Sequence, residues 1–173
     1  MIHHISIPAR NPQHVAGVLA ELMGGHCVPF GPLEGAYMAT SGDPHGTMIE
    51  VYPERATLDI PASDEQVVFG QNTAPPSNWP FHALLSVPLD TAQVEAIGAR
   101  EGWRAKTFGR GMQGHKPFFH VIEFWIENRL MLEVAPPSMT QEYLAFLKGA
   151  APATMSDPES VRLMRATHIK ENA

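Results

Sequence analysis

The chain has 173 residues, 44% of them hydrophobic, which is enough apolar material for one compact domain or for two small modules that share a core. A formal net charge of −6 with only 12 lysines and arginines argues against a nucleic-acid or anionic-membrane surface, and no apolar run approaches the ~20 residues of a membrane-spanning helix. The single cysteine, Cys27, excludes an internal disulfide, and MIHHISIPARN lacks the features of a secretory signal, so we expect a cytoplasmic protein that binds small molecules or other proteins.

The first predicted unit begins with an alternating strand at His4. The Asn-Pro pair at 11–12 is a helix start signal, apolar residues then recur at helical spacing, and Gly24 ends the helix. Two strand-like pieces follow in GAYMATSGDPHGTMIEVY, with the turn in SGDPHG. The unit is therefore predicted as a strand, a helix and two or three further strands.

The second predicted unit repeats this plan. A strand begins at His82, Asp90 and Gln93 form a capping-box pattern, and Gly102 ends the helix. His82 follows His4 by 78 residues, and Gly102 follows Gly24 by the same 78. An equal offset at both ends of the unit indicates an internal duplication.

The remaining segments complete the predicted organisation. The second unit closes with a hairpin in PFFHVIEFWIENRLMLEV, with its turn near residues 127–128. Residues 53–78 are rich in Pro, Ser, Asp and Asn and are predicted as a linker with one candidate strand at QVVFG. We expect units at 1–52 and 79–136, and a helical C-terminal extension at 137–173 with helices near 138–148 and 157–170.

Four polar residues are predicted on the sheet face that carries no helix. Glu50 and Glu133 each lie between aliphatic residues that face the helices, and the same alternation places His4 and His82 on the opposite face. Burying two carboxylates in a partly apolar hollow is costly unless a cation compensates them. Two imidazoles and two carboxylates suit a divalent metal such as Zn, Ni, Co, Mn or Fe(II).

At these residues the sequence resembles the vicinal oxygen chelate superfamily, which includes glyoxalase I, methylmalonyl-CoA epimerase, extradiol dioxygenases and fosfomycin or bleomycin resistance proteins. The resemblance covers about residues 2–136 and implies an α+β fold in which two βαβββ modules curl into a cup around a metal. It places the metal ligands at His4 in HHISI, Glu50 in MIEVY, His82 in FHALLSV and Glu133 in MLEVAP. The order His, Glu, His, Glu is most similar to glyoxalase I.

The resemblance implies a lyase or isomerase that moves a proton next to a carbonyl of a small oxygenated substrate. The metal would chelate two neighbouring oxygens and act as a Lewis acid, Glu133 would be the catalytic base, and Glu50 would be a ligand or second base. Pro8 stands where glyoxalase I has a cationic residue that helps to hold glutathione, which argues against a glutathione enzyme. The loop KTFGRGMQGHKP, with its three cationic residues at 106, 110 and 116, is another place where an anionic substrate could be held.

Two alternative functions stay open from the sequence. An Fe(II)-dependent ring-cleaving dioxygenase uses two histidines and one carboxylate, and Glu50 would fill a position that such an enzyme leaves open. A non-catalytic, resistance-type protein would sequester its ligand in the cup. The cup could be formed within one chain or shared across a homodimer, because both arrangements use the same strands.

Three further residues are predicted to contact the substrate. A turn at residues 127–128 would place Ile122 opposite Glu133, with His120 on their side of the sheet. Tyr52 and Arg129 share that face by the same alternation. Five other histidines are expected on the helix side or at the surface, namely His3, His14, His26, His45 and His168.

Overall fold

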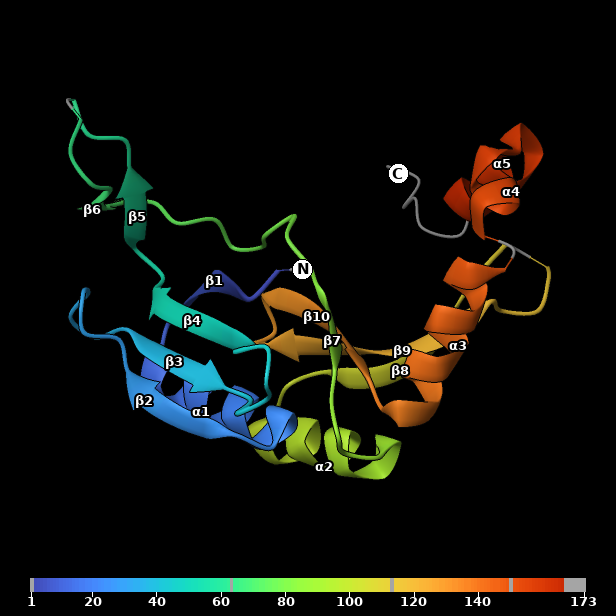
Figure 1. Cartoon of the computed structure of the whole chain (residues 1–173), viewed down its shortest axis with the longest axis horizontal. Helices are drawn as coiled ribbons and strands as arrows, with labels where there is room; N and C mark the ends of the chain where they lie inside the picture. The colour runs from blue at the N-terminus through green and yellow to red at the C-terminus, as the bar shows by residue number, and fades with distance from the viewer. Residues whose placement is uncertain (1, 63, 113, 150, 167–173) are drawn as a thin grey trace.

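A computed structural model describes residues 2–62, 64–112, 114–149 and 151–166. The described residues form two four-stranded sheets, one two-stranded sheet and five helices. Figure 1 shows that helices α1 and α2 lie on one side of the two large sheets, whereas the two-stranded sheet projects from the other side.

The first module has the order βαβββ. Its elements are β1 (His4–Ala9), α1 (Pro12–Met23), β2 (His26–Pro29), β3 (Tyr37–Thr40) and β4 (Met48–Pro53). The sheet order is β1-β4-β3-β2, and β1 runs parallel to β4 with Ser6 opposite Glu50. The first and last strands of the module are therefore neighbours.

The second module repeats the same order and the same sheet topology. Its elements are β7 (Leu84–Ser86), α2 (Thr91–Glu101), β8 (Ala105–Arg110), β9 (Phe119–Ile126) and β10 (Leu130–Ala135). The sheet order is β7-β10-β9-β8, with β7 parallel to β10. Leu84 lies opposite Glu133 just as Ser6 lies opposite Glu50. The predicted α+β fold with two βαβββ modules is confirmed.

The helix ends explain why the duplication is visible in the sequence. Asn11 accepts a hydrogen bond from the third residue after it, and Asp90 forms a complete capping box with Gln93. Gly24 and Gly102 end the two helices in the left-handed conformation with φ of 67° in both cases, a conformation that glycine adopts without a steric penalty.

One hydrophobic core joins the two modules. Aliphatic residues of the first module such as Ile7 and Val51 belong to the same buried cluster as Phe124 and Val134 of the second. These strand residues alternate with the polar ones, so the helix side of each sheet is apolar as predicted. The opposite face is left for polar groups.

The linker and one predicted loop contain strands that the sequence analysis did not assign. β5 (Ala56–Asp59) pairs with β6 (Val68–Gln71) in an antiparallel hairpin, whereas only a strand near β6 was expected. The beginning of KTFGRGMQGHKP belongs to β8, so Arg110 lies on a sheet and not in a flexible loop. The prediction of a loop there was wrong.

The register of the second hairpin also differs from the prediction by one residue. Glu127 and Asn128 both have positive φ and form the turn where it was expected, but Glu133 lies opposite Glu123, and Ile122 lies opposite Val134. A shift of one residue exchanges the two faces of a strand. The argument that placed His120 on the side of Glu133 was therefore wrong.

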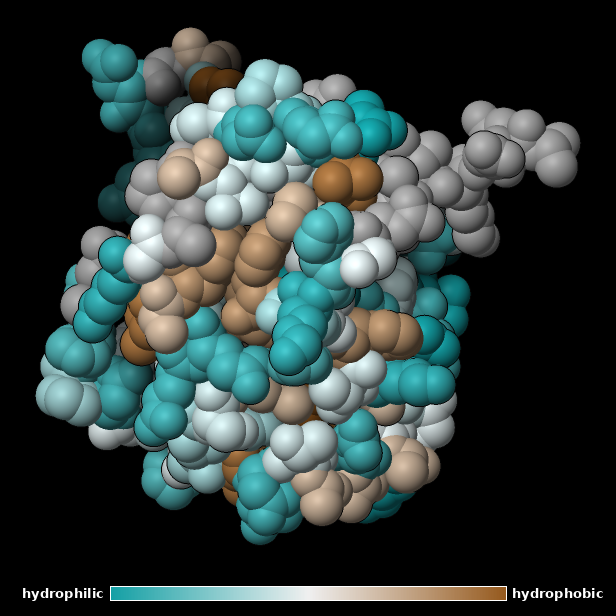
Figure 2. Space-filling model, turned by 90° about the vertical axis from the view of Figure 1, so that its right-hand side faces the viewer, coloured by the Kyte–Doolittle hydropathy of each residue, from teal (hydrophilic) through white to brown (hydrophobic). Residues whose placement is uncertain are grey.

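The C-terminal extension consists of helices, as expected. They are α3 (Pro137–Lys148), α4 (Ala151–Ser156) and α5 (Pro158–Ala166), and α3 packs against β9 and β10. Figure 2, which views the molecule from the side of this extension, shows hydrophobic surface among hydrophilic residues. The predicted helix end at 167–170 and His168 lie outside the described residues. No helix in the described ranges is long and apolar enough to cross a membrane.

Candidate functional site

Glu50 is a buried carboxylate on the helix-free face of the first module. Its residue surface is only 8% exposed. The Ser6 hydroxyl, from the neighbouring strand β1, donates to Oε2 of Glu50 at 2.8 Å, and the Tyr52 hydroxyl donates to the same oxygen at 2.5 Å. Two hydroxyl donors thus hold one carboxylate oxygen and fix the orientation of the group.

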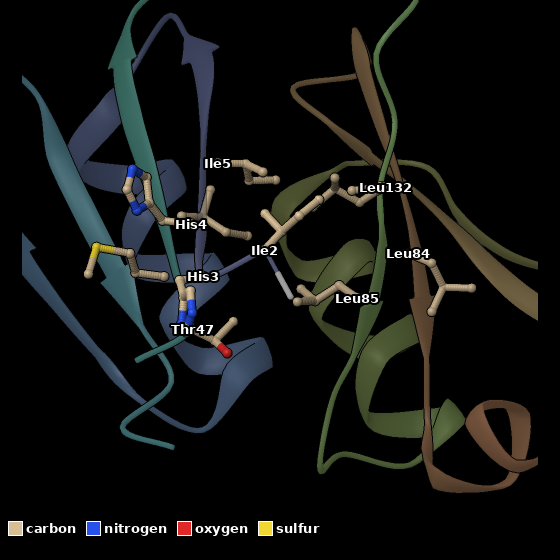
Figure 3. A pocket seen from close by; sticks show the side chains of 11 residues that line it. Ile2, His3, His4, Ile5, Thr47, Leu84, Leu85 and Leu132 are labelled. Atoms are coloured by element: carbon tan, nitrogen blue, oxygen red, sulfur yellow. The ribbon is translucent and has the colours of Figure 1, made fainter. Parts of the chain in front are cut away.

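The second oxygen of Glu50 points toward His4. The Nε2 atom of His4 lies 3.9 Å from Oε1 of Glu50, and the His4 side chain is 55% exposed. Figure 3 shows the His4 ring turned toward strand β4. Oε1 therefore lies beside an imidazole that solvent and small molecules can reach, while Oε2 is occupied by its two donors.

Tyr52 is held by aromatic neighbours from two other segments. Phe30 lies 5.4 Å from the Tyr52 ring and Phe69 of β6 lies 5.7 Å from it, the latter edge to face. Burial raises the pKa of the Tyr52 hydroxyl above its usual value, and the hydrogen bond to Glu50 raises it further. Tyr52 therefore remains a protonated donor to Glu50 at neutral pH.

Glu133 has different surroundings although it occupies the equivalent strand of the second module. The Arg110 Nε donates to Oε1 of Glu133 at 2.8 Å, and a terminal nitrogen of the same guanidinium lies 2.8 Å from this oxygen and donates to Oε1 of Glu123 at 2.9 Å. All three side chains are largely buried, with exposures of 17%, 13% and 21% for Arg110, Glu133 and Glu123. A guanidinium therefore already neutralises the charge of Glu133.

His82 is exposed and lies just before β7, two residues ahead of its first residue, Leu84. Of the four predicted metal ligands, the structure brings together His4 and Glu50. Within the described ranges, no three His, Cys, Asp or Glu side chains are grouped so that they could hold a metal ion. Because Oε1 of Glu133 is bound by a guanidinium, the four residues as placed do not fit a common metal centre in one chain, and the four-ligand site stays a prediction.

The two other predicted substrate contacts are engaged elsewhere. The backbone N–H of His120 donates to Oε2 of Glu142 in α3 at 2.8 Å, and Nδ1 lies 2.9 Å from the same oxygen. Arg129 donates to Glu54 and to the backbone carbonyls of Pro76 and Ser77. His120 thus contacts the C-terminal extension, and Arg129 contacts the linker.

Two pockets are lined by residues that contact Glu50. One, of about 220 Å³, is lined by both hydroxyl donors of Glu50, by the β5 hairpin strand and by Trp79 of the linker. The other, of about 170 Å³, lies between the modules and is lined by His4, by Ile5 and by leucines of the second module (Figure 3). The residues that contact Glu50 thus line both pockets, Ser6 and Tyr52 the first and His4 the second.

Sequence analysis missed two participants in these sites. Arg110 was assigned to a loop. Recognition of a strand that ends at Arg110 and pairs with β9 could have placed this residue beside the carboxylates. Trp79 stands alone in a proline-rich linker, and no local pattern indicates that the linker folds back over the first module.

Comparisons with known proteins find similar solved structures but no similar family model or curated sequence. No family model matches the chain, and no curated protein matches its sequence. A crystal structure titled "glyoxylase/bleomycin resistance protein/dioxygenase domain" from Frankia sp. EAN1pec is 16% identical, with a TM-score of 0.47 over 79% of this chain and 96% of that chain. The solution structure of protein ATC0852 from Agrobacterium tumefaciens is 13% identical, with a TM-score of 0.45 over 79% of this chain and 98% of that one.

The strand order gives the architecture independently of these comparisons. Each module has one parallel strand pair at its edge and two antiparallel pairs, and the two modules share a core. Paired βαβββ modules of this kind are the architecture that the sequence resemblance to the vicinal oxygen chelate superfamily implies, so that expectation about the fold is confirmed.

Proposed function

We propose that the protein is an enzyme that moves a proton at a carbon next to a carbonyl group in a small oxygenated substrate, with Glu50 as the base. The observation that supports this is the asymmetric setting of the Glu50 carboxylate. Oε2 is held by Ser6 and Tyr52, whereas Oε1 lies beside the accessible imidazole of His4. An oriented carboxylate next to an imidazole is the pair that such a proton transfer uses.

The proposed step is balanced within the substrate and the two side chains. Oε1 of Glu50 accepts the proton from carbon, and the electron pair of the C–H bond moves onto the carbonyl oxygen to give an enediol or enediolate. His4 donates a hydrogen bond to that oxygen and stabilises the developing charge. Return of the proton from Glu50 to the same carbon restores the starting compound. Return to the former carbonyl carbon gives the isomer, in which His4 gives a proton to the former carbonyl oxygen and takes the proton of the substrate hydroxyl, which becomes the new carbonyl.

Glu50 takes the role that the resemblance assigned to Glu133. A base must be free to accept a proton, but Oε1 of Glu133 already receives two nitrogens of Arg110. Protonation of Glu133 would break a largely buried ion pair, which is costly. Glu50 faces hydroxyl groups and an imidazole, so its protonation leaves no buried cation without a partner.

The sequence analysis predicts a divalent metal, and two of its predicted ligands, His4 and Glu50, lie next to each other. A bound metal would supply Lewis-acid stabilisation of the enediolate. Glu133 and His82 would have to leave their observed positions to complete the four-ligand set, so the proposed proton transfer uses the side chains of the chain itself.

The experiment is proton–deuterium exchange at the hydroxyl-bearing carbon of hydroxyacetone in heavy water, followed by NMR. We expect exchange with the unmodified protein, at least a hundredfold slower exchange with Glu50→Gln, and an intermediate rate with His4→Gln, since general acid–base groups contribute about 10²–10⁴-fold. Glu142→Gln is the matched control, because Glu142 is an exposed carboxylate that contacts His120 on the other module. Unchanged exchange in Glu50→Gln would refute the assignment.

The same preparation separates the alternatives. Elemental analysis measures which metal the protein contains. Dialysis against a chelator is expected to leave the exchange rate unchanged. Loss of exchange with recovery on adding Zn, Ni or Mn would instead support the four-ligand metal enzyme. Stoichiometric iron with oxygen uptake would favour the dioxygenase, and ligand binding without exchange would favour the resistance-type binding protein.

A further inference from the structure

The pocket over Ser6 and Tyr52 has two aromatic side chains in a mostly apolar lining. The side chains around it are Ser6, Ile7, Pro8, Tyr52, Ala56, Leu58 and Trp79, drawn from β1, β4, β5 and the linker. Tyr52 cannot swing away easily, because Phe30 and Phe69 pack against its ring. A mostly apolar pocket with two aromatic side chains in its lining favours a flat ring, which gains stacking energy beyond simple burial.

The size of the pocket limits the ligand to a single ring. Its volume of about 220 Å³ lies below the ~300–1,000 Å³ typical of sites for drug-sized molecules. The polar end of such a ligand meets the two hydroxyl oxygens that also hold Glu50.

Those hydroxyls determine which polar group the ligand can present. Serine and tyrosine each have one O–H donor, and both donors are used by Oε2 of Glu50. The oxygens of Ser6 and Tyr52 can therefore only accept a further hydrogen bond. A ligand hydroxyl can donate to them, whereas a bare carbonyl or a carboxylate can only compete with Glu50.

The negative charge of Glu50 also disfavours a ligand that carries a carboxylate. The side chain of Glu50 is largely buried, and its carboxylate accepts hydrogen bonds from the two hydroxyls. A ligand carboxylate placed there would face a like charge in a poorly solvated site. The pocket therefore disfavours organic acids, including small hydroxy acids.

We propose that this pocket recognises a neutral ligand with one aromatic ring and a hydroxyl group, the ring lying against Trp79 and the hydroxyl donating to Tyr52 or Ser6. The inference rests on the proposed function for the carbonyl group only, since His4 does not line this pocket. Combining the two gives an aromatic α-hydroxy ketone as the substrate class. Phenacyl alcohol is the smallest member of this class.

The test is a calorimetric titration with four related compounds. Phenacyl alcohol has both the ring and the hydroxyl, acetophenone lacks the hydroxyl, hydroxyacetone lacks the ring, and mandelate carries a carboxylate. We expect phenacyl alcohol to bind about tenfold more tightly than acetophenone or hydroxyacetone, because one hydrogen bond or one stacking contact is worth about a factor of ten. Mandelate is expected to bind most weakly.

Variants locate the two contacts. Trp79→Leu is expected to abolish the preference for phenacyl alcohol over hydroxyacetone. Trp79→Phe is expected to retain most of this preference, because it keeps an aromatic ring; the pair of variants therefore separates loss of the ring from a general disturbance of the linker. Trp103→Phe is the matched control, since Trp103 packs against Phe124 away from this pocket. Tyr52→Phe is expected to reduce the preference for phenacyl alcohol over acetophenone.

The outcomes separate this inference from the proposed function. Equal binding of hydroxyacetone and phenacyl alcohol, or tightest binding of mandelate, would overturn the ring-and-hydroxyl inference even if hydroxyacetone undergoes exchange that depends on Glu50. Ring-dependent and hydroxyl-dependent binding of phenacyl alcohol without any exchange would support the inference and overturn the proposed reaction.

Discussion

Arg129 of the second module is ion-paired with Glu54, which follows the last strand of the first module. The same guanidinium donates to the backbone carbonyl of Pro76 at 2.7 Å and to that of Ser77 at 3.2 Å. Arg129 therefore fastens the linker to both modules two residues before Trp79. The sequence assigned Arg129 to substrate contact, and its observed partners favour an indirect role through the position of Trp79.

We predict that Arg129→Ala lowers both stability and affinity for phenacyl alcohol. The Arg129 and Glu54 side chains are only 11% and 25% exposed, so the loss should cost roughly 1.5–3 kcal/mol, as for hydrogen bonds to charged groups. Urea unfolding measures the stability, and Arg10→Ala is the control because Arg10 is 63% exposed and lies 3.8 Å from Glu54. Equal effects of the two variants would contradict the proposed fastening of the linker.

Arg110 lies between two carboxylates that face each other across β9 and β10. Glu123 and Glu133 are directly opposite in register, and Arg110 contacts both. We predict that Arg110→Met destabilises the protein by roughly 3–5 kcal/mol, because it leaves largely buried charges without a partner. Combining Arg110→Met with Glu123→Gln and Glu133→Gln should recover most of this loss in chemical denaturation. A triple variant no more stable than Arg110→Met would contradict this explanation.

Helix α2 approaches β8 so closely that a methyl group does not fit at Gly98. A Cβ atom there would lie 2.4 Å from the Cβ of Ala105. We predict that Gly98→Ala destabilises the protein by about 1–3 kcal/mol despite the better helix propensity of alanine. Gly17→Ala in α1 is the control: nothing lies within 4 Å of its Cβ position, so it should stabilise the protein by up to about 1 kcal/mol. Similar melting temperatures for both variants would contradict this prediction.

The fold could be predicted from the sequence because its determinants are local. The C-terminal caps Gly24 and Gly102 lie 78 residues apart and the N-terminal caps Asn11 and Asp90 lie 79 apart, and strand alternation identifies which face of each sheet is apolar. The β5–β6 hairpin was only half predicted, since its strands are short and lie in a segment rich in turn-forming residues. Its pairing depends on contacts that no local pattern contains.

The site was predicted less completely than the fold for a related reason. Alternation correctly placed Glu50 and Tyr52 on one face, where they are hydrogen-bonded. It could not show that Arg110 compensates Glu133, because that contact depends on the register of two strands and on the assignment of β8. A shift of one residue was enough to place His120 on the wrong face.

Ion pairs join the two module helices α1 and α2 on the side away from the site. Arg100 of α2 donates to both carboxylate oxygens of Glu21 in α1, at 2.9 and 2.6 Å, and its Nε donates to Glu101 at 2.7 Å. His14 of α1 lies 2.6 Å from the other oxygen of Glu101. The network therefore connects the modules where their helices meet.

This network predicts a loss of stability at acidic pH. The hydrogen bond from Arg100 lowers the pKa of Glu21; burial acts to raise the pKa of Glu101, but Arg100 and His14 outweigh it and the net pKa is lowered. A carboxylate with a lowered folded-state pKa stabilises the fold above its unfolded value of about 4.3, and this contribution is lost as the pH falls through the folded pKa. The melting temperature of the unmodified protein should therefore exceed that of Arg100→Gln at pH 6, and the difference should shrink toward pH 3. Salt at 1 M should shrink it as well, because the Arg100 side chain is 52% exposed. A difference that is constant over this pH range would show that the ion pairs do not couple the helices.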